Sequence, residues 1–336
     1  MKKFMGFKIV GIILGVILLF ELIINVIPPK KVVKNNPFIV GKNKLPMIAA
    51  HRGGKSNAPE NTMLAFKKAV YENEVDVIEA DIYMTKDNKL VLHHNSYIDE
   101  NCDVNGDIEY EIVAEVCKNP ETRCLIENMT LEELKQYNFG YYFKNSEGER
   151  IYKDVKDLAN SDLQITTVEE LFEEFYQKNP DLLFILEIKN GGESGIKACE
   201  LLDEILNKYP NYMKNITIGS FHNEVENELK SRCPELLNGA SEKSATSFVL
   251  THFFGVNLFD KSNFACLQIP TAYNFKGKTV HLDSRSLIKR AHRKNIAVQY
   301  WTINEADEMR KLIELGCDCI MTDNPELLKE VLSEYK

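Results

Sequence analysis

The feature that most constrains the fold is a regular alternation of short apolar runs with amphipathic helical stretches through most of the 336-residue chain. The apolar runs have the length and composition of β-strands and lie at 47–51, 75–82, 90–93, 183–188, 216–221, 236–240, 266–269, 297–302 and 319–322. Helical periodicity separates most of them, at 61–72, 167–178, 195–208, 222–232, 284–294 and 305–315. Because continuous apolar strands that alternate with helices form parallel sheets, the pattern predicts an α/β fold.

The number of runs favours one large barrel. A (β/α)₈ TIM barrel needs eight strands, and this chain has one run more. The second and third runs are separated only by Lys86–Lys89 and their neighbours, which are too few for a helical crossover between parallel strands. We therefore predict that the third run returns as a hairpin and that the other eight form a barrel within residues 46–336. Residues 96–165 have weak periodicity and many charges, which predicts an insertion above the barrel mouth.

A separate apolar run lies near the N-terminus. Residues 9–27 are interrupted only by Glu21 and Asn25, and as a helix they would span roughly 28 Å, close to the thickness of a bilayer. A cleaved signal peptide and a buried core helix are the alternatives, but no small-residue cleavage site follows the run and it does not alternate with polar positions. We predict a short tail (1–8), an uncleaved transmembrane anchor (9–27) and a linker (28–45). The protein would then be a single-pass membrane protein with its catalytic body outside the cytoplasm.

Charge is distributed unevenly along the chain, whose overall net charge is −9. Residues 1–44 have a net charge of +7, because they contain eight lysines and one acidic residue. The remainder has a net charge of −16. An acidic body argues against a nucleic-acid partner, since binding to a phosphate backbone normally requires a basic face. A phosphorylated substrate would need a local source of positive charge, and a divalent cation is the usual one. Cys102, Cys117 and Cys124 could form disulfide bonds in an exported protein, although buried free cysteines are the alternative.

Ionisable residues cluster where the predicted strands end. His51 ends the first run and Arg52 follows it. Glu79 and Asp81 share one face of the second run because they are two residues apart. The third run ends in His93-His94-Asn95. TIM-barrel enzymes gather their catalytic groups at the carboxyl ends of the strands. Taken singly, each residue is more often structural, as a hydrogen-bonded histidine or a salt-bridge partner. Taken together, these residues indicate a functional site at the strand ends.

The residue types in this cluster suit the cleavage of a phosphodiester. Glu187, on a further strand, adds a third carboxylate to Glu79 and Asp81, and oxygen ligands of this kind bind Mg²⁺ or Ca²⁺. Two histidines can serve as acid and base. Arg52 and Lys189 would hold phosphate oxygens.

The order of the motifs resembles a known family. The segments HRGGKSNAPENTMLAFKKAV and VDVIEADIYMTKDNKLVLHHN are similar to the N-terminal signature of the glycerophosphodiester phosphodiesterase family. Further similarities are MTLEELKQYNFG, ITTVEELF, FILEIKN, IGSF, QYWTIN and GCDCIMTDNPELL, so the resemblance covers about residues 46–330. It implies a (β/α)₈ barrel and a metal-dependent cleavage of glycerophosphodiesters to glycerol 3-phosphate and an alcohol.

The resemblance also implies roles for individual residues. His51 and His94 become the catalytic pair, Glu79, Asp81 and Glu187 the ligands of one Mg²⁺ or Ca²⁺ ion, and Arg52 and Lys189 the phosphate contacts. Glu60 of the PENT motif would orient the turn that contains His51 and Arg52. Trp301 would line the barrel mouth and pack on the glycerol or alcohol moiety, with a core aromatic as an equal alternative.

Two departures from the family pattern leave alternatives open. The family has His-Asp where this chain has His94-Asn95, which would alter the rate or the pH optimum; the following Tyr97-Ile98-Asp99 favours His94 over His93 in the alignment. The HRGG turn resembles the membrane-associated branch, which includes lysophospholipases D. The alternatives are therefore a lysophospholipase D acting on lysophospholipids, a phospholipase D of the sphingomyelinase D type, and a catalytically weak, membrane-anchored binding protein.

Overall fold

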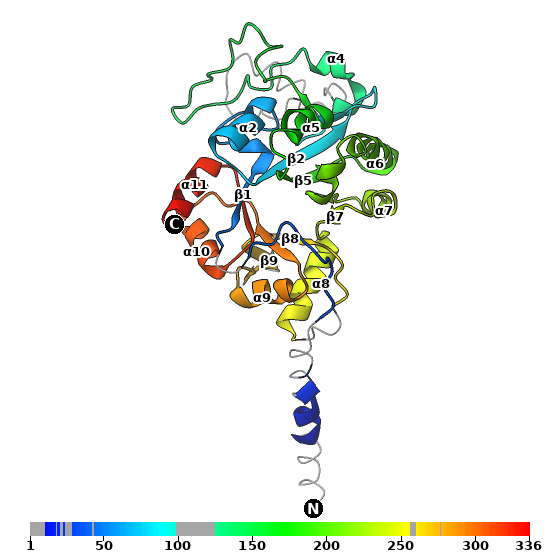
Figure 1. The fold of residues 1–336 in the computed structure, drawn as a ribbon, viewed down its shortest axis with the longest axis vertical. Coiled ribbons are helices and arrows are strands. Elements are labelled where there is room, and N and C mark those ends of the chain that lie inside the picture. The colour runs from blue at the N-terminus through cyan, green and yellow to red at the C-terminus, as the bar shows by residue number, and fades with distance from the viewer. Residues whose placement is uncertain are drawn as a thin grey trace, which may run out of the picture.

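The computed structural model describes residues 11–17, 19–20, 23, 29–41, 44–98, 125–255, 260–275 and 277–336. Within this part of the chain, eight parallel strands form a nearly closed barrel (Figure 1). In chain order they are β1 (Met47–Ala50), β2 (Val77–Met84), β5 (Leu183–Ile188), β6 (Ile216–Gly219), β7 (Leu237–Asn238), β8 (Cys266–Ile269), β11 (Ala297–Tyr300) and β12 (Cys319–Thr322). The prediction of a TIM-barrel fold is confirmed.

The order of the strands decides which strand ends meet. Neighbours pair in the order β7-β6-β5-β2-β1-β12-β11-β8. The ring closes between β7 and β8, where Gly239 forms a parallel bridge with Cys266 and Ala240 N–H donates to the Cys266 carbonyl over 2.9 Å. Since β1 and β12 are parallel neighbours, the residues that follow them emerge side by side at one end of the barrel.

Helices surround the barrel (Figure 1). The predicted helical stretches correspond to α2 (Met63–Lys67, continued by a π-helix over Lys68–Glu72), α5 (Val168–Tyr176), α6 (Gly192–Leu206), α7 (Asn223–Arg232), α9 (Arg285–Arg293) and α10 (Ala306–Leu315). The pattern missed α8 (Glu242–Phe253) and α11 (Pro325–Ser333). In α8, every residue of which is described, Phe248 is the one buried residue, so this helix has no apolar stripe that a periodicity could reveal.

The third apolar run is a hairpin partner, as predicted. Strand β3 (Leu90–Leu92) pairs antiparallel with β2, and the two-residue β4 (Thr166–Thr167) pairs antiparallel with β3. The described part of the insertion, 125–165, contains α4 (Leu131–Leu134) and shares a small apolar core with β3, made of Val91, Ile126, Leu134 and Ile165. Cys102, Cys117 and Cys124 lie outside the described residues. The described cysteines 199, 233, 266, 317 and 319 are free and buried. A second hairpin, β9 (Ala272–Phe275) and β10 (Lys278–His281), follows β8 and was not predicted.

Residues 29–41, most of the predicted linker, pack across the amino-terminal end of the barrel. The Asn36 side-chain amide donates to the carbonyls of Ala265 and Asn295 over 2.8 and 3.1 Å. Phe38 is fully buried in an apolar cluster with residues of several barrel strands. Val40 N–H donates to Asp318 Oδ1 over 3.1 Å, just before β12. This segment therefore closes the end of the barrel opposite to the strand ends that carry the predicted site.

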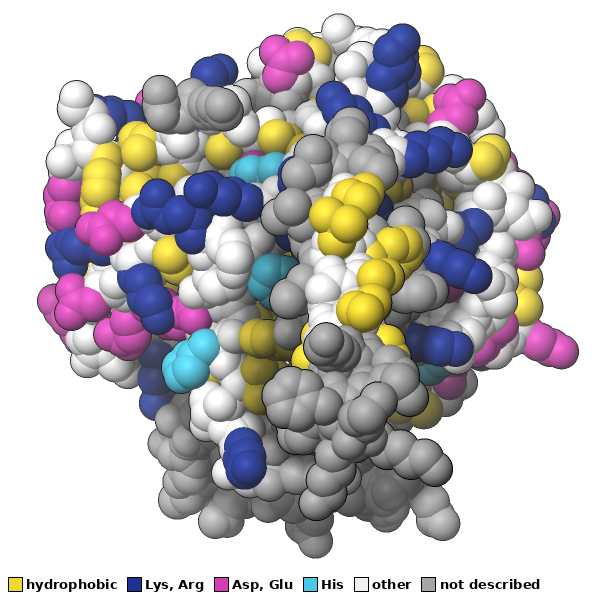
Figure 2. Space-filling view, turned by 90° about the horizontal axis from the view of Figure 1, so that it is seen from below, with side chains coloured by type: hydrophobic (Ala, Val, Ile, Leu, Met, Phe, Trp, Pro, Cys, Tyr) yellow, Lys and Arg dark blue, Asp and Glu magenta, His cyan; other side chains and the backbone are white. Residues whose placement is uncertain are grey.

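The predicted membrane anchor is contradicted by the structure. Of residues 9–27, the described ones are 11–17, 19–20 and 23; they are helical and expose apolar side chains, which Figure 2 shows on the segment seen from below. Among the residues that the structure describes, no helix has both the length and the apolar character needed to cross a bilayer. This finding overturns the predicted transmembrane helix and the predicted single-pass, extracytoplasmic localisation.

Candidate active site

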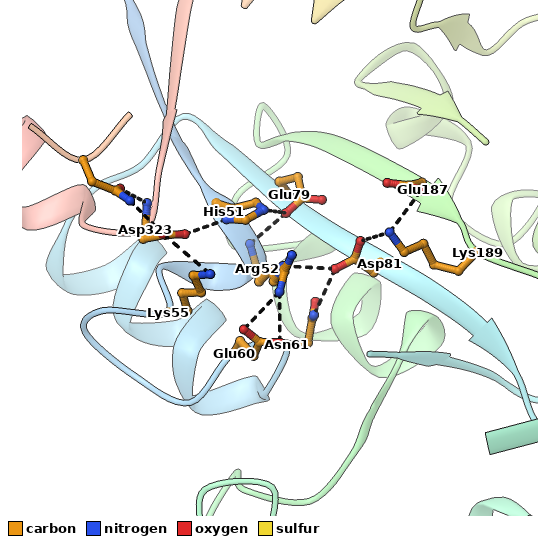
Figure 3. A network of polar contacts seen from close by, with 11 residues as sticks. His51, Arg52, Lys55, Glu60, Asn61, Glu79, Asp81, Glu187, Lys189 and Asp323 are labelled. Carbon is orange, nitrogen blue, oxygen red and sulfur yellow. Dashed lines mark hydrogen bonds and ion pairs between the residues drawn. The ribbon is translucent and has the colours of Figure 1, made fainter. Parts of the chain in front are cut away.

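The carboxyl ends of β1 and β12 bring His51 and Asp323 together (Figure 3). His51 lies in the short 3₁₀ turn η1 (His51–Gly53), and its Nδ1 is 2.6 Å from Asp323 Oδ1. Asn304, which follows β11, donates its amide hydrogen to Asp323 Oδ2 over 2.8 Å. Burial raises the pKa of the Asp323 carboxyl, but the contacts with His51, Asn304 and Lys55 together lower it more, so the net shift is downward. Asp323 is therefore a carboxylate at neutral pH.

Arg52 is held by two acidic residues. Its backbone N–H donates to Glu79 Oε2 over 2.8 Å, and its Nη1 donates to both carboxylate oxygens of Glu60 at 3.3 Å. The backbone of Arg52 has a φ of 52°, in the left-handed region, which turns the chain sharply after β1. Nε of Arg52 is buried and has no hydrogen-bond partner among the described residues, although Asp81 Oδ2 lies 3.5 Å away. The guanidinium is thus fixed in place while its buried Nε–H has no hydrogen-bond partner among the described residues.

Three carboxylates lie on the adjacent strands β2 and β5. Asp81 pairs directly with Glu187 across the sheet, and Glu79 lies two residues earlier on the same face as Asp81. Lys189 Nζ lies 3.3 Å from Asp81 Oδ1 and donates to Glu187 Oε1 over 3.1 Å. Burial and the charge of Asp81 raise the pKa of Glu79 well above its usual value. Burial also raises the pKa of Glu187, against the lowering effect of Lys189.

The two histidines after β3 differ in their surroundings. His93 is buried, with Nε2 3.1 Å from the Tyr97 carbonyl and its ring packed edge-on against Phe139. His94 is half-buried, and burial lowers its pKa; the charges of Asp81 and Arg52 also act on this pKa in opposite directions. The contacts of His93 are those of a structural residue, whereas His94 faces the charges of the site.

Trp301 stands apart from these contacts. It follows β11 directly and is 41% exposed, so it is not the core aromatic that sequence reasoning offered as an alternative. Its backbone N–H donates to the Ile269 carbonyl at the end of β8 over 3.3 Å. The indole therefore lies at the same end of the barrel as His51.

Sequence reasoning missed three residues that contact this cluster. Asp323 and Asn304 lie behind His51, and Asn61 donates to Asp81 Oδ2 over 3.3 Å. Asp323 and Asn304 belong to the TDNP and WTIN segments, which carried the family resemblance without an assigned role. Their position directly after or shortly after barrel strands was the signal that could have identified them.

The carboxylates suit a divalent cation by their chemistry. Among the described residues, no group of three or more His, Cys, Asp or Glu side chains was found that could hold a metal ion. In the structure the Lys189 ammonium pairs with Asp81 and Glu187 instead. Glu79 is only 5% exposed and has a strongly raised pKa, which means that its charge is poorly compensated here. Carboxylate oxygens in this condition fit Mg²⁺ or Ca²⁺ rather than a soft metal.

Comparison with known sequences gives a family match over most of the chain. The sequence model of the glycerophosphoryl diester phosphodiesterase family matches residues 51–327. A glycerophosphodiester phosphodiesterase of Caldanaerobacter subterraneus is 26% identical over 282 residues, which span 84% of this chain and 96% of the relative. A lysophospholipase D of Mus musculus is 24% identical over 310 residues, spanning 86% of this chain and 82% of the relative.

Solved structures share the fold. A glycerophosphoryl diester phosphodiesterase domain from Mycobacterium tuberculosis has a TM-score of 0.64 at 17% identity, over 85% of this chain and 99% of the domain. An Oleispira antarctica phosphodiesterase in complex with the product sn-glycerol-3-phosphate has a TM-score of 0.60 at 20% identity, over 86% of this chain and 97% of that one. At such identities the likeness shows a common barrel.

Proposed function

Because this chain belongs to the glycerophosphoryl diester phosphodiesterase family, we propose that it hydrolyses glycerophosphodiesters to glycerol 3-phosphate and an alcohol. Membership of the family makes it an enzyme, a hydrolase of phosphoric diesters. The observation that carries the proposal is the linked set of contacts from Asp323 through His51 and Glu79, and from Arg52 through Asp81 to Lys189, at one end of the barrel (Figure 3). The catalytic domain is residues 46–336, with 96–165 as an insertion.

The proposed roles follow from the donors and acceptors. His51 and His94 transfer the protons: one deprotonates the nucleophile and the other protonates the leaving alkoxide. Arg52 and Lys189 bind the non-bridging phosphate oxygens. The unused, buried Nε of Arg52 supports this role, because a buried donor without a partner is unfavourable until a ligand accepts from it. Trp301 packs on the glycerol or alcohol moiety.

The acidic residues of β2 and β5 would hold one divalent cation, Mg²⁺ or Ca²⁺. Glu79, Asp81 and Glu187 are the proposed ligands, and their mutual repulsion in a buried place supports the proposal. The cation would supply positive charge that polarises the phosphoryl group. Its binding would also offset the charge of the carboxylates, which Lys189 and Arg52 offset only in part.

A lysophospholipid is the second candidate substrate. The HRGG turn would place the chain in the branch that contains lysophospholipases D, and a relative with that name is similar along most of its length. Exposed aromatic side chains support this candidate: Phe221, Tyr273 and Trp301 all follow the carboxyl ends of barrel strands, where an acyl chain could lie against them.

The test uses the full-length chain with glycerophosphocholine, glycerophosphoethanolamine, glycerophosphoglycerol and lysophosphatidylcholine, each in Mg²⁺, in Ca²⁺ and in EDTA. Release of glycerol 3-phosphate supports the first substrate class and release of lysophosphatidate the second. We expect EDTA to abolish turnover. The ion that restores turnover, Mg²⁺ or Ca²⁺, is then the cation that the enzyme uses. Binding without turnover of any substrate would contradict the proposed hydrolase activity and support the alternative of a binding protein.

Variants test the individual roles. His51→Ala and His94→Ala each lower kcat by about 10²–10⁴-fold, the usual contribution of a positioned acid or base. Glu79→Gln removes the stabilisation that the cation gives against heat, whereas Glu235→Gln, at an exposed position, retains it. Substantial turnover in either histidine variant, or a cation-dependent Tm rise that persists in Glu79→Gln, contradicts the corresponding assignment.

A further inference from the structure

Both oxygens of the Asp323 carboxylate are in use behind His51. Oδ1 lies 2.6 Å from His51 Nδ1, and Oδ2 accepts from the Asn304 amide over 2.8 Å. Lys55 Nζ, on a partly exposed side chain, lies 3.7 Å from the same Oδ2. The other ring nitrogen of His51, Nε2, points the opposite way, 3.9 Å from Glu79 Oε2 and toward the remaining charged groups (Figure 3).

The orientation of the Asn304 amide is fixed by its own partners. Its Oδ1 accepts from the backbone N–H of Asp323 over 3.0 Å and from the Thr322 hydroxyl over 3.2 Å. Two donors therefore face this oxygen, so the amide nitrogen must face Asp323. A carboxylate accepts hydrogen bonds and donates none. His51 Nδ1, the second nitrogen that contacts Asp323, must therefore carry a hydrogen. In the neutral ring Nε2 is then unprotonated.

We propose that Asp323 and Asn304 form a positioning pair that holds His51 in the tautomer protonated at Nδ1, so that Nε2 exchanges the proton with the phosphodiester. This inference rests on the proposed function, since it assigns a role to residues behind a histidine that the hydrolysis requires. Neither residue contacts the substrate in this role. The same relation between a carboxylate and a reacting imidazole occurs on unrelated folds, where it fixes the tautomer and the ring orientation.

The carboxylate is not needed to hold the backbone of its own turn. The Asp323 backbone N–H donates to Asn304, and the Asp323 carbonyl accepts from Ser56 N–H over 2.9 Å. The first turn of α11 is capped by the neighbouring Asn324, whose side chain accepts from Leu327 N–H. An isosteric change of the carboxylate therefore leaves these contacts in place, which makes the variant Asp323→Asn informative.

A second histidine–aspartate pair in the barrel supplies a matched control. His292 Nε2 lies 2.7 Å from Asp318 Oδ2, and the Asp318 carboxylate also accepts from the backbone N–H groups of Val40 and Val298 over 3.1 and 2.7 Å. Asp318 precedes β12, whereas Asp323 follows it, so the two pairs lie at opposite ends of the same strand. Because it lies at the end of the barrel opposite to His51, the His292–Asp318 pair is a matched control for a histidine–aspartate contact away from the site.

The variant Asp323→Asn reverses the tautomer. Because Asn304 still donates toward position 323, the new amide must turn its oxygen to Asn304 and its nitrogen to His51 Nδ1. The neutral His51 ring then keeps its hydrogen on Nε2, so this nitrogen cannot accept a proton. The imidazolium form also loses the carboxylate that stabilises it, so the ring is impaired as a general acid as well. We expect kcat to fall roughly 10²–10⁴-fold, as for the equivalent change in a serine protease triad, while KM changes by less than about threefold.

The double variant Asp323→Asn/Asn304→Asp restores the pattern with the same net charge. The new carboxylate at 304 accepts from the amide nitrogen at 323, and the amide oxygen again accepts from His51 Nδ1–H. We expect kcat to recover at least about tenfold over Asp323→Asn, a gain that mere packing would not produce. Asp318→Asn lowers Tm but leaves kcat within about threefold of the wild type.

The outcomes separate this inference from the proposed function. If the wild type turns over none of the substrates, the proposed function is wrong. If the wild type is active and Asp323→Asn retains its kcat, or the double variant shows no recovery, the positioning pair is wrong. If Asp323→Asn does not fold, the ¹⁵N shifts of His51 in the wild type decide, with assignment by His51→Gln. Protonation of Nδ1 in the neutral ring supports the inference, and protonation of Nε2 overturns it.

Discussion

At the scale of single residues, the two proposed catalytic histidines are supported differently. His51 has the Asp323 carboxylate behind it at 2.6 Å. His94 is half-buried and is followed by Asn95, which brings no charge. Burial lowers the pKa of His94 below the usual value of 6.5, so its ring is neutral at pH 7 and becomes protonated only at lower pH. The neutral ring is ready to act as a base.

This asymmetry predicts the acidic limb of the pH profile. If neutral His94 is the base, the midpoint of the acidic limb of kcat/KM lies below 6.5, the ordinary pKa of an imidazole, because burial lowers the pKa of His94. Asn95→Asp adds a negative charge next to the ring, which stabilises the protonated form and moves the limb to higher pH. Asn207→Asp, an equal change of charge at the exposed end of α6, leaves the limb in place. A wild-type limb above 6.5, or an unmoved limb in Asn95→Asp, contradicts this role.

Sequence reasoning found the residues of the site that lie within its own motifs. His51, Arg52, Glu60, Glu79 and Asp81 come from the two segments of one N-terminal signature, and the structure joins them by direct contacts. It missed Asp323, which is 272 positions from the histidine that it contacts. A sequence pattern does not show how distant strands pair. The pairing of Ala50 with Thr322 brings His51 and Asp323, the residues that follow them, together.

At the scale of elements, the turn after β1 depends on two consecutive glycines with positive φ. Gly53 and Gly54 have φ of 82° and 88°. A Cβ on Gly54 would lie 2.8 and 2.9 Å from ring carbons of Pro325, the first residue of α11. The HRGG turn therefore lets α11 approach η1 closely, and Asp323 lies two residues before that contact.

Gly54→Ala should weaken both the fold and the site. The left-handed φ costs about 1–2 kcal/mol for a residue with a Cβ, and the clash with the rigid proline ring adds about 1–3 kcal/mol. We expect a corresponding fall in the free energy of unfolding and a lower kcat, because α11 and Asp323 must shift. Denaturant unfolding measures the free energy of unfolding, and turnover of the folded enzyme measures kcat.

Gly148→Ala is the control for backbone strain alone. Gly148 has φ of 83°, but a Cβ at this position would meet none of the described atoms within 4 Å, so only the cost of the left-handed backbone applies. Equal losses in the two variants, or a normal kcat in Gly54→Ala, would show that the approach of Pro325 does not matter for the site.

Most elements with their own pattern were predicted, but α11 was missed although it buries Leu328, Val331 and Leu332 at helical spacing. The barrel strands are continuous apolar runs, and the short link after β2 indicated the hairpin with β3. The helix α8 buries Phe248 alone among its twelve described residues, and within the described chain the β9–β10 hairpin pairs only with itself, so neither shows a strong periodicity.

At the scale of the whole molecule, the barrel has two ends with different tasks. The carboxyl ends of the strands carry the polar groups of the site, and the amino-terminal end is covered by residues 29–41. The lysines and prolines of this segment favoured a linker, because the composition is polar overall. Composition does not reveal that a single apolar side chain of the segment is buried. Phe38 is that side chain, and it is fully buried against residues of the strands.

Phe38→Ala therefore tests whether the segment is part of the folded barrel. Removing a fully buried phenylalanine costs about 3–5 kcal/mol when the cavity cannot collapse, and we expect that loss in the free energy of unfolding. The kcat of the folded enzyme should not change, since Phe38 packs at the end of the barrel opposite to His51. Phe254→Ala, at a side chain that is 71% exposed, changes stability by no more than about 0.5 kcal/mol. A loss below about 1 kcal/mol in Phe38→Ala would mean that the barrel closes without this segment, and a large fall in kcat would mean that the two ends are coupled.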